Sequence, residues 1–134
     1  MFTSVILGAG KSTRMKANKS KLLFSIAGKP VINHILSSLK DAKAKHNICV
    51  INNSSAELKK ILEAENISFA YQKTLDGTAG AVKAALKAKK TSNAKLLILC
   101  GDIPFITSSS IKKLVSKLKN YDAVVGTVEL ESPK

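Results

Sequence analysis

Short apolar runs rich in branched residues alternate with longer segments in which apolar residues recur at helical spacing. The short runs predict strands at residues 3–7, 47–51, 67–71, 96–100 and 122–128. The longer segments predict helices. One starts at Pro30 and runs through Leu39, and another covers 55–65. A third is capped by Thr78 and reaches about Lys89, and the last is capped by Thr107 or Ser108 and runs through Leu118.

The alternation of strands and helices predicts a three-layer, Rossmann-like α/β fold with about five largely parallel strands. The run at 96–100 is the most continuous in apolar character, which is typical of a strand covered on both faces. Ligands of such sheets bind beyond the carboxyl ends of the strands. Polar and glycine-rich segments follow two of the predicted strands, at Gly8–Arg14 and at Gly101–Asp102. If those strands are neighbours, both segments face one crevice.

Length and composition indicate one domain over residues 1–134. An apolar fraction of 45% excludes a disordered tail, and no apolar run is long enough to span a bilayer. No basic segment precedes the first apolar run, so a signal peptide is not expected. Cys49 and Cys100 both lie in apolar runs, which favours reduced, buried thiols over a disulfide. The expected compartment is the cytoplasm.

The net charge of +13 raises the question of nucleic-acid binding. However, the excess consists of 21 scattered lysines and a single arginine, Arg14, with no tryptophan and two tyrosines. Arginine is the preferred phosphate fork, and aromatic side chains supply base stacking. The composition therefore favours a solvated, lysine-rich surface that attracts polyanionic small molecules such as triphosphates. No nucleic-acid partner and no membrane partner are expected.

The loop after the first strand resembles two common phosphate-binding motifs only in part. Its Gly10-Lys11-Ser12-Thr13 matches the end of a P-loop, but Val5 stands where that motif needs its first glycine. A dinucleotide fingerprint would need a glycine in place of Thr13, and the second strand ends in Asn52-Asn53 with no carboxylate for a ribose. The sequence therefore favours neither motif.

A different set of motifs, spread in order along the chain, fits far better. They are Leu7-x-Ala9-Gly10-x-x-Thr13-Arg14-Met15, then Lys21, then Gly28-Lys29-Pro30, then Gln72 followed by Gly77-Thr78-Ala79, and finally Leu99-Cys100-Gly101-Asp102-Ile103-Pro104. This set resembles the sugar-1-phosphate nucleotidylyltransferase family, and within it the N-terminal uridylyltransferase domain of bacterial N-acetylglucosamine-1-phosphate uridylyltransferases. The resemblance covers essentially the whole chain.

The resemblance implies a domain that binds a nucleoside triphosphate, here UTP, and transfers its nucleotidyl group to a sugar 1-phosphate, here N-acetylglucosamine-1-phosphate, with Mg²⁺ as cofactor. Arg14 can offer a planar fork to the leaving pyrophosphate, Lys21 a point charge near the α-phosphate, and Asp102 a carboxylate for Mg²⁺. Glycines at 8 and 10 let backbone N–H groups approach phosphate oxygens. The nucleotide-binding residues that the resemblance implies are Leu7, Gly8, Ala9, Gly10, Lys11, Gln72, Gly77 and Thr78.

Each of these residues also has a purely structural interpretation. The two glycines could form only a tight turn, and Arg14 and Lys21 could be surface cations. Asp102 could cap the approach to a helix, and Gln72 could be an exposed polar residue at a strand end. His34 and His46 have no ligand-like spacing to a cysteine or a second histidine, and no role is assigned to them.

The sequence departs from the family pattern at four positions. Gly8 replaces a small alanine, Ser12 a glycine, Gly80 a histidine and Cys100 a frequent tyrosine. These changes are mild for phosphate binding but leave the preferred base open.

The chain also stops at Lys134, before the family's G-Y-G-R segment and its acceptor-sugar portion. The expectation is a partial domain, either active or a catalytically incomplete nucleotide-binding subunit. A homodimer, or a C-terminal half supplied elsewhere, is expected to cover the apolar strand at 122–128.

Overall fold

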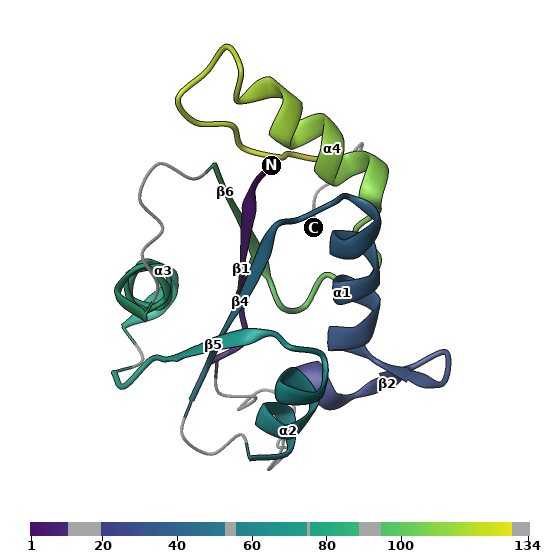
Figure 1. Cartoon of the computed structure of the whole chain (residues 1–134), viewed down its shortest axis with the longest axis vertical. Helices are drawn as coiled ribbons and strands as arrows, with labels where there is room; N and C mark the ends of the chain where they lie inside the picture. Colours follow the sequence, from purple (N-terminus) through teal and green to yellow (C-terminus); the bar gives the residue numbers. More distant parts are fainter. Residues whose placement is uncertain (11–19, 53–55, 75, 89–94, 130–134) are drawn as a thin grey trace.

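Four parallel strands form the central sheet, in the order β5–β4–β1–β6 (Figure 1). The structure is a computed structural model that describes residues 1–10, 20–52, 56–74, 76–88 and 95–129. Its strands are β1 (Thr3–Leu7), β4 (His46–Ile51), β5 (Ser68–Tyr71) and β6 (Leu96–Cys100). β1 pairs with both β4 and β6, so the polar segments after β1 and β6 leave the sheet side by side. The two strands are thus neighbours, which is the condition for a common site that the sequence analysis stated.

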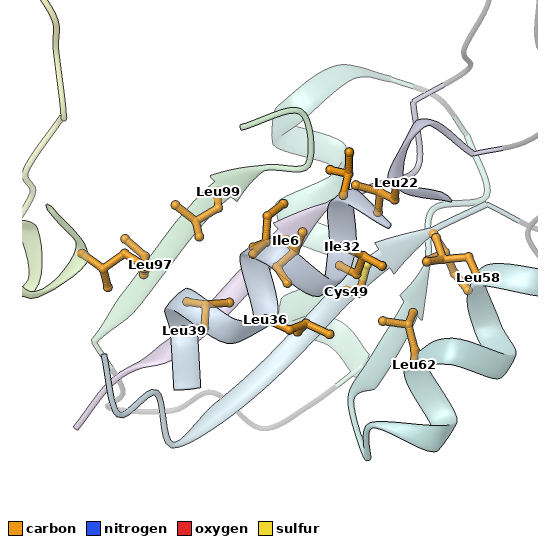
Figure 2. Packing of buried hydrophobic residues seen from close by; sticks show 14 of the residues in the cluster. Ile6, Leu22, Ile32, Leu36, Leu39, Cys49, Leu58, Leu62, Leu97 and Leu99 are labelled. Atoms are coloured by element: carbon orange, nitrogen blue, oxygen red, sulfur yellow. The ribbon is translucent and has the colours of Figure 1, made fainter. Parts of the chain in front are cut away.

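Helices cover both faces of this sheet and give the three layers that the sequence predicted. On one face lie α1 (Val31–Asp41), α2 (Ala56–Ala64) and α4 (Ser108–Lys117). On the opposite face lies α3 (Gly77–Ala88) (Figure 1). The α1 side holds the larger core, where side chains such as Ile6, Leu22 and Ile32 point into the space between α1 and the sheet (Figure 2). The α3 side holds a smaller core of Val, Ile and Ala residues.

A small hairpin connects the first strand's loop to α1. Its strands are β2 (Ser25–Ile26) and β3 (Lys29–Pro30), and it follows a short 3-10 turn, η2 (Lys21–Leu23). The hairpin turns at Ala27 and Gly28, which both have positive φ, a backbone conformation that glycine adopts without strain. Gly28 of the Gly-Lys-Pro motif is therefore a turn residue, and α1 begins at Val31, one residue after the predicted start.

The helix ends follow the predicted signals in one case and not in another. The side chain of Thr107 accepts a hydrogen bond from Ser110 N and caps α4, as predicted. Helix α3 begins at Gly77, so Thr78 lies inside its first turn and is not the residue before the helix. Asp76 occupies that preceding position, and aspartate is among the preferred N-cap residues.

The predicted strand at 122–128 is wrong. Residues 123–129 are irregular, and the side chains of Val125 and Val128 are 81% and 83% exposed. Branched residues favour a strand only where a pleated, partly buried surface receives them. Among the described strands, β6 pairs on one side only, with β1, and the segment does not join it. The described sheet therefore has four strands and not about five.

Within the part of the chain that the structure describes, strand β6 is covered on one face only, contrary to the prediction for its apolar run. Leu97 and Leu99 are buried in the core on the α1 side, whereas Ile98 is 46% exposed and Cys100 is exposed. The physical reason is the placement of α3, which packs over β5, β4 and β1, while β6 lies at the edge of the sheet. Cys49 in the central β4 is buried as predicted, and Cys100 is not.

None of the helices in the described part of the chain is long and apolar enough to cross a membrane.

Candidate functional site

The sequence-predicted site residues that the structure describes gather at the carboxyl edge of the sheet. There the backbone hydrogen bonds of the sheet continue by one residue beyond β1, β5 and β6. Gly8 N–H donates to Val50 O at 2.8 Å, Gly101 N–H to Leu7 O at 3.0 Å, and Gln72 N–H to Ile51 O at 3.0 Å. The segments after β1, β5 and β6 therefore start from one edge. Lys11 and Arg14 lie outside the described residues.

Two glycines at this edge make room for one leucine. A Cβ on Gly8 would lie 2.5 Å from Leu22 Cδ1, and a Cβ on Gly101 would lie 2.6 Å from Leu22 Cδ2. Leu22 has no exposed surface and belongs to the core on the α1 side (Figure 2). The glycines thus let the Lys21–Leu23 turn sit directly on the ends of β1 and β6. The N–H of Gly8 donates to Val50 O, and the role of Gly8 that the structure shows is this packing.

The anchored turn brings Lys21 to Asp102. Lys21 Nζ donates to Asp102 Oδ2 at 2.8 Å, although 81 positions separate the two residues. The side chains are 29% and 58% exposed, so both still face solvent. The hydrogen bond from Lys21 lowers the pKa of the Asp102 carboxyl, and partial burial opposes this effect. Asp102 is therefore ionised at neutral pH, with Lys21 beside it.

An asparagine after β4 holds the loop that follows β1. Asn52 Nδ2 donates to Ala9 O at 3.1 Å, and Ala9 is buried. Gly10 comes next and is exposed, and none of the described residues has an atom within 4 Å of the place where its Cβ would stand. Asn52 was not predicted as a site residue, because a dinucleotide site would need a carboxylate at this place and not an amide. The signal that could have found it is a polar side chain directly after a buried strand.

The predicted base-reading segment follows β5. Gln72 is only 7% exposed, which removes the interpretation of it as an exposed polar residue. Its Nε2 donates to Asp76 Oδ1 at 2.9 Å and to Gly77 O at 3.1 Å. Gly77 has a φ of +88°, and Thr78 is exposed in the first turn of α3. Asp76 was not predicted, because its contact with Gln72 appears only when the chain turns into α3.

The edge therefore has two chemically different ends. Gln72 follows β5, the strand at one side of the sheet, and Asp102 follows β6, the strand at the other side. Three strand spacings of ~4.8 Å separate these strands, which is about 14 Å. One end offers a buried amide beside the N-terminus of a helix, and the other offers a charged pair. Such an edge suits an elongated ligand with a polar, uncharged part and an anionic part.

Asp102, a single carboxylate at this edge, could provide one ligand of a magnesium ion. Asp102 is ionised and more than half exposed, and the bond to Lys21 uses only its Oδ2. Mg²⁺ commonly takes one or two carboxylates and completes its shell with water and substrate phosphates. Among the described side chains, no group of three or more His, Cys, Asp and Glu residues is arranged to hold a metal ion.

Comparison with known sequences gives a family and several relatives. The description of MobA-like NTP transferase domains matches residues 4–132. The bifunctional protein GlmU of Staphylococcus haemolyticus is 38% identical over 112 residues, which are 84% of this chain and 25% of that protein. GlmU of Buchnera aphidicola is 37% identical over 131 residues, which are 96% of this chain and 28% of that protein. The chain thus spans about a quarter of the length of these relatives.

Comparison with solved structures gives the same fold. A nucleotidyl transferase from Methanothermobacter superposes with a TM-score of 0.73 at 18% identity, over 87% of this chain and 57% of that one. Rv0371c of Mycobacterium tuberculosis, solved as a complex with manganese, superposes with a TM-score of 0.69 at 16% identity, over 87% of this chain and 58% of that one. At this identity the likeness establishes the fold, and the match along the sequence establishes the family. The chain belongs to the family of MobA-like NTP transferase domains, which are nucleotidyltransferases.

Proposed function

We propose that the carboxyl edge of the sheet binds a nucleoside triphosphate and that the bound nucleotide is transferred to a sugar 1-phosphate. The base lies at the end formed by Gln72, Gly77 and Thr78, and the phosphates lie at the end formed by Gly10, Lys21 and Asp102. The observation that carries this proposal is the Lys21–Asp102 pair, held at 2.8 Å on the strand ends by the buried Leu22. A fixed cation beside a fixed carboxylate suits a triphosphate that arrives with a divalent metal.

The substrate pair that we propose is UTP and N-acetylglucosamine-1-phosphate. It rests on the family motifs in this sequence and on the 35–38% identity to proteins named GlmU. Residues 1–134 then form a single, partial nucleotidyltransferase domain. The buried, reduced Cys49 agrees with a cytoplasmic location.

In this proposal the protein positions the reactants and neutralises charge. An oxygen of the sugar phosphate attacks the α-phosphorus, and pyrophosphate leaves. Lys21 is a point charge for an α-phosphate oxygen, and Arg14 is a fork for the leaving pyrophosphate. Leu7, Ala9 and Lys11 complete the loop around the nucleotide.

Asp102 would hold the Mg²⁺, which supplies charge neutralisation on the phosphate oxygens when bound.

A second candidate is a nucleotide-binding unit that needs further protein for turnover. Two observations favour it. The chain spans about a quarter of the length of GlmU proteins, and β6 has a half-exposed Ile98 on the face that α3 leaves open. In this case the chain binds the nucleotide, while a second segment or chain supplies the contacts to the sugar phosphate.

Two measurements on the purified chain separate these candidates. Calorimetric titration with UTP, CTP, GTP and ATP, each with Mg²⁺, tests nucleotide binding, and we expect a bound nucleotide whose affinity falls in Asp102→Asn. Release of pyrophosphate from UTP and N-acetylglucosamine-1-phosphate tests turnover. Binding with turnover supports the enzyme, and binding without turnover supports the second candidate. The absence of binding of all four nucleotides would refute both.

A further inference from the structure

The side-chain amide of Gln72 has a fixed orientation. Its two partners, a carboxylate oxygen of Asp76 and the carbonyl oxygen of Gly77, can only accept hydrogen bonds. The atom between them must therefore be the nitrogen, and both of its protons are used. Rotation of the amide would set its oxygen against these two acceptors, and the nitrogen of this 7% exposed side chain would lose both hydrogen bonds. Gln72 can thus present only its Oε1 to a ligand.

The contact with Asp76 depends on a glycine in the next turn of the helix. A Cβ on Gly80 would overlap the carboxylate group of Asp76, both oxygens and the carbon between them. No other residue type leaves this space open. The absence of a side chain at Gly80, in the second turn of α3, therefore lets the carboxylate reach Gln72. Gly80 is also one of the positions where the sequence departs from the family pattern.

We propose that Asp76 and Gly80 form a positioning pair that makes Gln72 a hydrogen-bond acceptor for the base. This inference rests on the proposed function, because it assumes that the base lies at this end of the edge. No donor among the described side chains and backbone groups reaches Gln72 Oε1 in the hydrogen bonds around it. An acceptor at this place selects a base that carries an N–H on its pairing edge.

Uracil and cytosine provide the matched test of this selection. Uracil carries an N–H at ring position 3 and donates to Oε1, whereas cytosine has an unprotonated nitrogen there and would place two acceptors against each other. The two nucleotides have the same size and the same phosphates. A buried acceptor left without a donor costs enough to weaken binding by about tenfold or more. UTP should therefore bind at least about tenfold more tightly than CTP.

Four variants separate positioning from helix stability. Asp76→Asn keeps an acceptor oxygen and an N-capping residue. Asp76→Ser keeps an N-capping hydroxyl, but its oxygen stands about where Asp76 Cγ now lies, one bond short of Gln72. Gly80→Ala leaves Asp76 and Gln72 in the sequence but displaces the carboxylate, while alanine favours the helix. Lys83→Ala, one turn further along α3 and exposed, is the matched control.

The experiment has one readout without ligand and one with ligand. In ¹⁵N NMR, the Gln72 side-chain NH₂ should be protected from solvent exchange in the wild type, in Asp76→Asn and in Lys83→Ala, and should lose protection in Asp76→Ser and Gly80→Ala. Calorimetric titration with UTP and CTP should show the tenfold preference in the first three proteins and a ratio near one in the last two. Thermal unfolding confirms that each variant is folded.

The outcomes distinguish this inference from the proposed function. Tight UTP binding with equal CTP binding in the wild type overturns the inference and leaves nucleotide binding intact. An unchanged preference in both Asp76→Ser and Gly80→Ala, or an exchange rate of the Gln72 amide that neither variant alters, also overturns it. If the wild type binds neither nucleotide, the proposed function fails, and the role in base selection fails with it.

Discussion

At the residue scale, Gly8 and Gly10 belong to the same sequence motif but have different surroundings in the structure. The missing side chain of Gly8 admits Leu22, whereas no described residue lies within 4 Å of a Cβ placed on Gly10. Sequence motifs assign both to phosphate binding, because a motif records which residue is present and not what fills the space beside it. The structure shows that Gly8 packs against Leu22, and contacts of either glycine with a nucleotide belong to the proposed function.

This difference predicts that alanine affects stability at Gly8 and nucleotide binding at Gly10. Gly8→Ala forces Leu22 or the strand end to move, so we expect it to lower the free energy of unfolding by about 1–3 kcal/mol. Gly10→Ala meets no atom of the described residues and should leave stability within about 0.5 kcal/mol. It should weaken nucleotide binding, because in the proposed function this side of the loop faces the nucleotide. Urea unfolding and calorimetry of both variants test this. Equal stability of Gly8→Ala and the wild type would contradict the packing role.

The two cysteines should differ in thiol reactivity, because one is buried and the other is exposed. Burial raises the pKa of the Cys49 thiol to about 12, while Cys100 is exposed at the end of β6. The thiolate is the reactive form, so Cys49 should be inert in the folded protein. A thiol reagent at pH 8 should modify one cysteine in the native chain and two after unfolding in urea. The native reaction should disappear in Cys100→Ser and persist in Cys49→Ala. Modification of both thiols in the native wild type would disprove the burial of Cys49.

Several contacts that hold the candidate site could not be predicted from the sequence. The motifs predicted that Lys21 and Asp102 belong to one site, and the structure joins them. They could not predict the partners that hold the site, because Leu22, Asn52 and Asp76 act through contacts that only the folded chain creates. Neither hydrophobic pattern nor motif spacing contains that information.

At the scale of elements, periodicity predicted the helices and four of the strands, because an apolar stripe reports where a residue must be buried. Periodicity does not report how many neighbours an element has. Ile98 was expected under a helix and Val125 in a strand, but α3 does not extend over the first and no described strand pairs with the second. Both wrong predictions thus concern residues whose burial or pairing depends on which element lies beside them.

The one-sided cover of β6 gives a prediction about adjacent residues. Leu97 is buried in the core, and Ile98 on the other face is 46% exposed. Leu97→Ala should therefore cost about 2–5 kcal/mol of unfolding free energy, because it leaves a cavity. Ile98→Thr keeps a branched side chain suited to a strand and should cost less than about 1 kcal/mol. Urea unfolding of both variants measures the difference. Similar large costs for both would mean that the α3 face of β6 is buried after all.

At the scale of the whole molecule, exposed apolar side chains and net charge act in opposite directions. Most of the large exposed apolar residues in the described part of the chain lie on β6 and in the segments after it; they are Ile98, Ile103, Phe105, Tyr121, Val125 and Val128. Met1, Tyr71 and Leu86 are exposed elsewhere. An apolar side chain of this size contributes about 1.5–3 kcal/mol when it becomes fully buried. A second copy could bury several of them at once, and the side of β6 that no described strand pairs with offers backbone groups for pairing. The net charge of +13 makes two copies repel each other.

Salt decides which of these effects prevails, and this gives the prediction for assembly. At ~0.15 M salt the Debye length is about 8 Å, so the scattered lysines of two copies are largely screened from one another, while apolar burial is not weakened. We therefore expect a dimer at micromolar concentration in this buffer, and a shift toward monomer at about 0.01 M salt, where the Debye length is about 30 Å. Light scattering at both ionic strengths measures the shift. Ile98→Lys should favour the monomer at either ionic strength, because it places a charge on the free face of β6, whereas Lys83→Ala on α3 should not. A wild-type chain that is monomeric at both ionic strengths would show that the apolar residues around β6 do not drive self-association.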